Sequence, residues 1–233
     1  MQILFYKELN PEDFHVKPTA IIKVMLVNAS NISVAVQELI DSTQDLVWID
    51  KLDIVPRASF EQTAIRTVAR LVAKFGAIQN KLTSDVGEYL VSYSASKGLD
   101  EAFGHSSVPI SELWKEKITG NHGFDFHSES QENIISFGEA KYNSNANPYD
   151  DAAKQAIRFL GDSKDSGDAI FLQYFVSQHA METFLFQGAR GVALAFSVSS
   201  ANPLGILDNA LDNANIMTLS GLCDELYLIG VVV

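Results

Sequence analysis

The chain has 233 residues, of which 47% are hydrophobic, and its formal net charge is −12. This length and hydrophobic content are enough for a large core, so we expect one compact unit. Residues 1–118 carry 12 basic and 15 acidic side chains, which gives a net charge of −3. Residues 119–233 carry 5 basic and 14 acidic side chains, which gives a net charge of −9. Such acidity argues against a protein that, without a partner, binds nucleic acid through a basic face. It is compatible with a site that concentrates metal cations, or with a basic partner.

The N-terminal residues and the cysteine content indicate the compartment. The opening MQILFYKELN lacks the basic and apolar regions of a signal peptide, and no apolar run reaches the roughly 18 residues that span a bilayer. The single cysteine, Cys223, excludes an internal disulfide and a cysteine-based zinc site, and we expect it to be a small buried residue. We therefore expect a cytoplasmic protein that does not bind membranes.

Apolar patterns predict the elements of the first part of the chain. Two strands at 3–9 and 20–27 precede a helix at 33–42 and a further segment at 47–55. Between Ser59 and Phe75, apolar residues recur every three or four positions, which predicts a helix that ends at Gly76. The next predicted helix covers residues 82–99, with Ser84 as its N-cap and Gly98 as its end.

The second part of the chain predicts a hairpin followed by helices and strands. After the hairpin, a polar loop leads to Asp150, a suitable N-cap for a helix at 151–161. Residues 168–186 are strongly apolar and fit either a strand or a helix, and they are suited to a core or to a partner surface. A strand at 191–200, a helix at 203–214 and a strand at 224–233 follow. This order favours an α/β or α+β fold with a mixed central sheet flanked by helices.

Two carboxylates and an ammonium are brought together by the predicted hairpin, residues 120–142. Side chains two positions apart leave the same face of a strand, so Glu139 and Lys141 point together and Ala140 points away. The partner strand carries Asp125, which the turn places alongside. Mg²⁺ takes hard oxygen ligands, and Asp125, Glu139 and the Ala140 carbonyl can supply them. Lys141 can orient the attacking water or offset charge in a phosphodiester transition state.

A purely structural explanation of these charges is open at this point. Glu-x-Lys pairs are common on solvated strands, where they contribute roughly a few tenths of a kcal/mol, and Asp125 can simply end a strand. The apolar run IISFG before Glu139 instead indicates a buried strand, in which charges persist only when paired or bound to metal. A glycosidase built on the two carboxylates leaves Lys141 without a role.

The segments GFDF and IISFGEAK resemble the core hairpin of the PD-(D/E)xK nuclease superfamily. In that family an Asp ends one strand and an acid-x-Lys motif lies on the next, and these positions match Asp125, Glu139 and Lys141. Phe124 stands where the family motif has proline. The resemblance implies a restriction-endonuclease-like fold and DNA cleavage with Mg²⁺, for which Mn²⁺ can substitute.

The same resemblance assigns further residues and a domain organisation. It implies a metal-binding Glu88 on the helix before the hairpin and a Gln155 that lines the site from the helix after it. It places the nuclease core at residues 79–233 and makes residues 1–78 an N-terminal α/β elaboration. Glutamate is also a good helix former that is often merely solvated, so the role of Glu88 depends on the resemblance.

Three longer stretches are similar to a narrower family, the small nuclease subunits (HamA) of Hachiman anti-phage defence systems. They are SELWKEKITGNHGFDFHSE, SFGEAKY and DELYLIGVVV, and the similarity extends from residue 81 to the C-terminus. It implies an effector that degrades DNA and is held in check by a helicase partner of the HamB kind. The alternative is a non-catalytic assembly or sensor module on a nuclease-like fold, which the acidic composition favours.

Two histidines flank the predicted aspartate of the hairpin. His122 precedes the strand, and His127 lies two residues after Asp125, so it can share the face of that residue. A metal-ligand or general-base role is open to either histidine. We expect both to be hydrogen-bonded structural residues, with His127 in a supporting role at the site.

Overall fold

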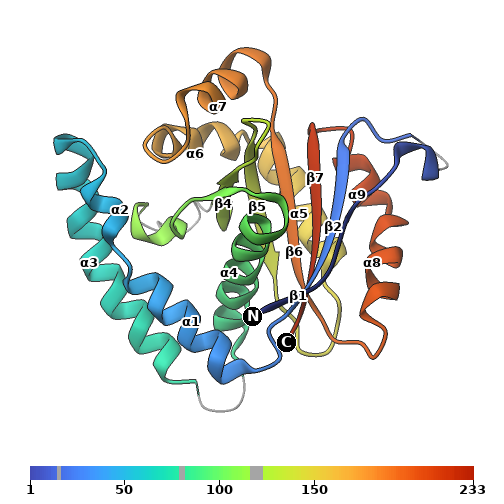
Figure 1. Cartoon of the computed structure of the whole chain (residues 1–233), viewed down its shortest axis with the longest axis horizontal. Helices are drawn as coiled ribbons and strands as arrows, with labels where there is room; N and C mark the ends of the chain where they lie inside the picture. The colour runs from blue at the N-terminus through green and yellow to red at the C-terminus, as the bar shows by residue number, and fades with distance from the viewer. Residues whose placement is uncertain (15–16, 79–81, 116–122) are drawn as a thin grey trace.

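The protein is a mixed α/β structure in which helices flank a seven-stranded mixed sheet, as the computed structural model in Figure 1 shows. The structure describes residues 1–14, 17–78, 82–115 and 123–233. The strands are β1 (Gln2–Glu8), β2 (Ile21–Asn28), β3 (Ser106–Ser107), β4 (Phe126–Glu129), β5 (Ile135–Lys141), β6 (Gly191–Val198) and β7 (Glu225–Val232). The helices are α1 (Ile32–Gln44), α2 (Val47–Asp50), α3 (Ile54–Gly76), α4 (Ser84–Phe103), α5 (Tyr149–Gly161), α6 (Lys164–Leu172), α7 (Gln178–Glu182), α8 (Pro203–Leu211) and α9 (Ala214–Leu219). Single 3-10 turns lie at Pro11–Asp13 and Ser111–Leu113, and a π-helical turn lies at Thr183–Gln187.

The strand order places the predicted hairpin inside one continuous sheet. The order is β1-β2-β7-β6-β5-β4-β3. The four central strands, β2, β7, β6 and β5, run parallel to one another. The outer strands β1, β4 and β3 run antiparallel to their neighbours. Inner parallel strands are covered on both faces, which explains why β6 and β7 are almost uniformly apolar. The mixed sheet predicted from the sequence is confirmed.

Helices cover both faces of the sheet and create two apolar layers. On one face, α1, α3 and α4 contribute Leu39, Leu71 and Leu90 to a layer with Tyr227 and Ile229 of β7. On the other face, helices α5, α8 and α9 pack small and aliphatic residues against the sheet (Figure 1). These residues are Ala152, Ala153, Ala156, Leu207, Ala210, Ile216 and Leu219. The hairpin strand β5 therefore lies between two packed layers, which explains how a charged residue in it becomes buried.

Helix α4 differs from its prediction at both ends. The side chain of Thr83, not Ser84, is the N-cap, because its hydroxyl accepts a hydrogen bond from the Val86 N–H at 3.4 Å. The helix also continues through Gly98 and ends at Gly104, which has φ +67°. A Cβ at Gly98 would lie 2.6 Å from the Met25 Cε, so glycine permits close packing of α4 on β2. The predicted helix end at Gly98 was therefore wrong.

Helix α5 also begins differently from the prediction. Its N-cap is Pro148, and Asp150 lies in the first turn instead of capping it. The Asp150 Oδ1 accepts hydrogen bonds from the side-chain amides of Asn213 at 2.9 Å and Asn215 at 2.7 Å. Hydrogen bonds from Lys154 and from these amides lower the pKa of Asp150 to about 2. The carboxylate thus links α5 to α9.

The apolar segment 168–186, for which strand and helix were both open, is helical throughout most of its length. It forms the end of α6, all of α7 and most of the π-helical turn. Phe171 and Phe175 pack against Phe60 of α3, with ring centroids 6.4 and 6.0 Å from it. Leu185 and Phe186 remain exposed, by 61% and 82%. The segment therefore supplies both core and apolar surface.

Two expectations about compartment and cysteine can be compared with the structure. Among the helices that the structure describes, none is long and apolar enough to cross a membrane. Cys223 is buried, as expected, and its thiol donates to the Leu219 carbonyl at 3.3 Å. Burial raises the pKa of this thiol to about 12, so Cys223 is an unreactive packing residue.

Candidate active site

The hairpin brings the three predicted residues of the motif together. Asp125 lies directly before β4, and its N–H donates to the Gly138 carbonyl of β5 at 2.8 Å. Its carboxylate Oδ2 in turn accepts a hydrogen bond from the Ala140 N–H at 3.0 Å. The Lys141 Nζ donates to the Glu139 Oε1 at 2.7 Å and to the Ala140 carbonyl at 3.2 Å. Two carboxylates and one ammonium therefore lie close together where β5 pairs with the residues at the start of β4, as the strand register predicts.

Helix α4 adds Glu88 to this group. The Glu88 Oε1 lies 3.9 Å from the Lys141 Nζ, and the side chain is 39% exposed. The neighbouring residue, Gly87, faces the ring of Tyr142, which would collide with any Cβ at that position. Because glycine lets α4 approach the end of β5 this closely, Glu88 reaches the hairpin. The structure thus places Glu88 beside the motif, where the resemblance expected it.

The carboxylate of Glu139 is electrostatically the most unusual group of the site. It is fully buried, and burial together with the nearby charge of Asp125 raises its pKa well above the ordinary value, against the opposing effect of Lys141. Within the described residues, the Glu139 Oε2 is buried and has no hydrogen-bond partner. Burial by itself would lower the pKa of Lys141, but the carboxylates of Glu139 and Asp125 outweigh it and raise that pKa. The local fold therefore holds the fully buried Glu139 between a half-buried carboxylate, Asp125, and a half-buried ammonium, Lys141.

This set of groups fits a hard divalent cation. A dication would relieve the repulsion between Glu139 and Asp125 and satisfy the unpartnered Oε2. No group of three or more His, Cys, Asp or Glu side chains is arranged as a ready metal cage in the part of the chain that the structure describes. Mg²⁺ does not require such a cage, because it usually keeps several waters and binds one or two carboxylates plus substrate phosphate. The residues present are therefore compatible with Mg²⁺ and do not resemble a zinc site.

A cleft of about 380 Å³ opens beside the hairpin, between α3, α4 and the segment before β4. Its described lining is Arg70, Leu71, Lys74, Asp85, Glu88, Tyr89, Ser92, Ile110, Glu112 and Asp125. Asp125 and Glu88 thus face a space large enough for a substrate group, whereas Glu139 lies behind them in the sheet. Basic side chains occur in this lining only on α3, among the residues that the structure describes.

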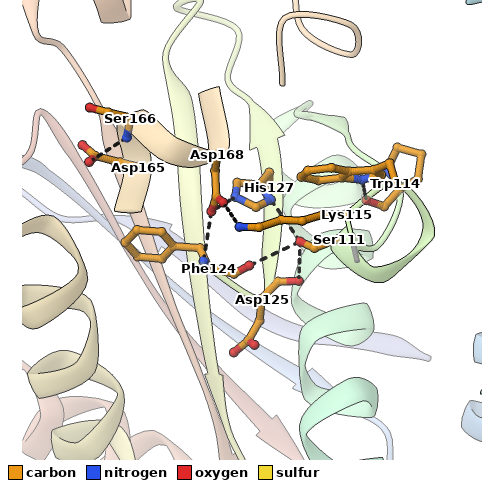
Figure 2. A network of polar contacts seen from close by, with 10 residues as sticks. Ser111, Trp114, Lys115, Phe124, Asp125, His127, Asp165, Ser166 and Asp168 are labelled. Carbon is orange, nitrogen blue, oxygen red and sulfur yellow. Dashed lines mark hydrogen bonds and ion pairs between the residues drawn. The ribbon is translucent and has the colours of Figure 1, made fainter. Parts of the chain in front are cut away.

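A buried polar network holds the backbone of Asp125 from behind (Figure 2). Asp168 of α6 accepts hydrogen bonds from the Phe124 N–H at 3.0 Å, from the His127 Nε2 at 3.2 Å, and from the Lys115 ammonium. The Ser111 hydroxyl lies 3.3 Å from the Phe124 carbonyl, 3.2 Å from the Asp125 carbonyl and 3.4 Å from the His127 Nδ1. Each peptide group around Asp125 is therefore tied to a side chain that is itself fixed.

The charges of this network are balanced despite their burial. Burial raises the pKa of Asp168, but the hydrogen bonds and charges of His127 and Lys115 outweigh it, so the net pKa is lowered. Ser111, His127 and Asp168 are the residue types of a hydrolase triad. However, Ser111 is only 7% exposed and its hydroxyl bonds to backbone carbonyls, so it is not placed as a nucleophile. The three residues form a support for the strand.

His127 has the hydrogen-bonded structural position that we expected for it. It is fully buried, and its ring also packs against Trp114 and Phe137. It is absent from the described lining of the cleft, and its ring nitrogens contact Asp168 and Ser111, which hold the backbone next to Asp125. The second histidine of the prediction, His122, lies outside the described residues.

Gln155 is the predicted residue that the structure does not bring to the others. It is half-buried on α5, which packs on β5 and β6, and it is absent from the described lining of the cleft. Its role stays a prediction. Sequence reasoning missed Ser111, Lys115 and Asp168, because no local pattern distinguishes them and only the fold joins segments so far apart in the chain.

In comparisons with known proteins, no family model and no curated protein matches the chain. The site is therefore interpreted from its geometry and from the hairpin motif.

Proposed function

We propose that the chain is a metal-dependent DNA nuclease with a PD-(D/E)xK core, which hydrolyses phosphodiester bonds. The main support is the buried Oε2 of Glu139, which lies beside Asp125 and Lys141 and has no hydrogen-bond partner among the described residues. A buried carboxylate with an unsatisfied oxygen is costly for folding, roughly 1–3 kcal/mol. Buried ionisable groups with strongly shifted pKa values are typical of active sites, where they bind a ligand or take part in catalysis.

In the proposed mechanism, Asp125 and Glu139 would hold Mg²⁺. The Ala140 carbonyl and Glu88, which both contact Lys141, would be the further oxygen groups at the site. The ion, when bound, polarises the phosphate and lowers the pKa of a bound water. Lys141 is fixed by the Glu139 Oε1 and by the Ala140 carbonyl, so its ammonium keeps one orientation. From there it offsets the negative charge that develops on the phosphate, or orients the attacking water.

The support behind the strand contributes by limiting motion of Asp125. Asp168 and Ser111 hold the peptide groups on either side of this residue, through Phe124 N–H and the two carbonyls. Catalytic rates fall steeply when a reacting group is displaced by about 1 Å. Asp168 and Ser111 are therefore positioning residues in this proposal, and they do not contact the substrate.

The wider role that we propose is that of an effector subunit in an anti-phage defence system, controlled by a helicase partner. The support for it is the resemblance of three stretches to Hachiman nuclease subunits together with the net charge of −12, which disfavours tight DNA binding by this chain alone. A helicase that engages DNA would supply the missing affinity. Cytoplasmic action follows from this role, since the DNA to be degraded is inside the cell.

The test is degradation of plasmid DNA by the full chain, with and without the helicase partner, in Mg²⁺ or in EDTA. The matched control is a double variant, Glu139→Ala with Lys141→Ala, which removes both the candidate ligand and the ammonium. Cutting that requires Mg²⁺ and disappears in the variant is the expected result. A folded complex that leaves DNA intact under every condition would refute the nuclease.

The competing proposal is a non-catalytic assembly or sensor module on the same fold. The 2.7 Å contact between the Lys141 Nζ and the Glu139 Oε1 favours it, because an ion pair of this kind can serve structure alone. The two proposals separate in a phage-challenge assay of Asp125→Ala with Glu139→Ala. Full protection by this variant would favour the module, and loss of protection with normal folding favours the nuclease.

A further inference from the structure

Helix α3 carries an unusual charge for this chain. It contains four basic residues, Arg57, Arg66, Arg70 and Lys74, and one acidic residue, Glu61, whereas the whole chain has a net charge of −12. The last three basic residues recur at intervals of four, so they lie along one side of the helix at steps of about 6 Å. The helix therefore presents a line of positive charge, which we call the basic stripe (Arg66, Arg70 and Lys74).

The orientation of α3 directs this stripe toward the candidate active site. The apolar side of the helix is buried through Ala64, Leu71 and Phe75, which fixes the rotation of the helix. Two residues of the stripe, Arg70 and Lys74, consequently line the same cleft as the candidate metal ligands Glu88 and Asp125.

Lys74 is held in place within the cleft. Its Nζ donates to the Asp85 carboxylate at 2.9 Å and lies 5.3 Å from the centre of the Tyr89 ring. Tyr89 is itself anchored, since its hydroxyl donates to Glu112 at 3.0 Å and its ring packs on Phe75. Arg66 and Arg70 are exposed and extend the positive charge along the helix. Together these three cations suit a charged chain that enters the cleft from the side of α3.

We propose that the basic stripe binds the phosphodiester backbone of a DNA strand and sets one phosphate opposite Asp125. That this phosphate is the one that is cleaved rests on the proposed function. Binding of DNA by the stripe does not depend on the proposed function. Phosphate contacts supply most of the sequence-independent affinity for DNA and position it without reading bases. Arginine suits this task because its guanidinium matches phosphate oxygens in two hydrogen bonds. Without such a stripe, Glu88, Asp85 and Asp125 would repel the substrate.

The inference assigns a function to the N-terminal part of the chain. Residues before 79, which the motif does not cover, would supply the substrate wall, and the hairpin would supply the chemistry. Activity would then require both parts of the chain in one structure.

The test is a measurement of DNA binding that does not depend on cleavage. Fluorescence anisotropy of a labelled DNA duplex and of a matching single strand is recorded in EDTA, between about 50 and 200 mM NaCl. The wild type is compared with Arg70→Gln and with the triple variant Arg66→Gln, Arg70→Gln, Lys74→Gln. The control is Lys17→Gln, an exposed cation (66% side-chain exposure) paired with Glu12 beyond the opposite edge of the sheet. Thermal unfolding verifies that each variant is folded.

The salt dependence gives the expected result in numbers. Each phosphate contact that is lost lowers the slope of log affinity against log salt by about 0.9 for duplex DNA and about 0.7 for a single strand. For Arg70→Gln, we expect the slope to fall by the amount that corresponds to about one phosphate contact. For the triple variant, we expect a fall that corresponds to about two to three contacts, and for Lys17→Gln we expect an unchanged slope.

Two failures can be distinguished. If the stripe variants bind DNA with the wild-type slope while the wild type still cuts DNA, the stripe inference is overturned and the nuclease stands. If the slope falls as expected but no condition produces cutting, the nuclease is refuted and the binding surface stands. Absence of DNA binding by the wild type at the lowest salt, or preference for RNA of equal length, also overturns the inference.

Discussion

The substitution Glu139→Gln is expected to abolish cleavage and at the same time to stabilise the metal-free protein. Glu139 is fully buried, its Oε1 is paired with Lys141, and its Oε2 has no partner among the described residues. Glutamine has nearly the same shape and keeps an acceptor for Lys141. It removes a charge whose burial and repulsion by Asp125 together outweigh its attraction to Lys141, as the raised pKa of Glu139 indicates. Relief of an unsatisfied buried charge corresponds to about 1–3 kcal/mol.

The pH dependence of this gain follows from the raised pKa of Glu139. A group whose pKa is higher in the folded than in the unfolded state contributes stability that is fully present below the unfolded value, here 4.5, and is lost as the pH rises through the folded value. In that window the wild type loses up to about 1.4 kcal/mol of unfolding free energy per pH unit. The glutamine variant does not titrate, so the difference between the two proteins grows toward higher pH.

Urea denaturation in EDTA, at about pH 5 and about pH 8, measures this difference. The matched control is Glu132→Gln, which changes an exposed carboxylate and is expected to shift stability by less than about 0.5 kcal/mol. Added Mg²⁺ at about 100 times its Kd should stabilise the wild type by about 2.7 kcal/mol and the Glu139→Gln variant by much less. If the variant is less stable than the wild type at the higher pH and the two pH profiles run parallel, the electrostatic reasoning is refuted.

Two further substitutions probe the packing and the support of the site. Gly138→Ala places a Cβ 2.5 Å from the Phe126 ring inside the sheet, so the unfolding free energy should fall by about 1–3 kcal/mol, and an unchanged urea midpoint would contradict this packing. Asp168→Asn removes the buried acceptor of His127 and Lys115, and it should destabilise the protein by about 3 kcal/mol near neutral pH. Because the pKa of Asp168 is lowered, its contribution is present above the unfolded value of 3.8 and disappears as the pH falls through the folded value. Circular dichroism during acid titration should show the wild type and this variant converging at low pH.

Much of the fold was predictable because it depends on short-range patterns. Uninterrupted apolar runs predicted β6 and β7, and periodic apolar positions predicted α3 from Ser59 onward, although the helix begins earlier, at Ile54. These patterns record which faces of an element must be covered. The ends of helices were less predictable. Gly98 resembles a helix end in the sequence, yet Met25, from a distant strand, needs the space that glycine leaves. A local pattern does not contain that information.

The same division holds for the candidate site. By itself the sequence determined that Asp125, Glu139 and Lys141 would meet, because a hairpin with a short turn has a register that follows from alternation along its strands. Only the tertiary structure decided that Glu88 reaches Lys141 and that Asp168 and Ser111 hold the peptide groups of Asp125. It also decided that Arg70 and Lys74 line the cleft. These contacts join segments far apart in the chain, and their geometry arises from how helices pack on the sheet, which depends on all the buried side chains together.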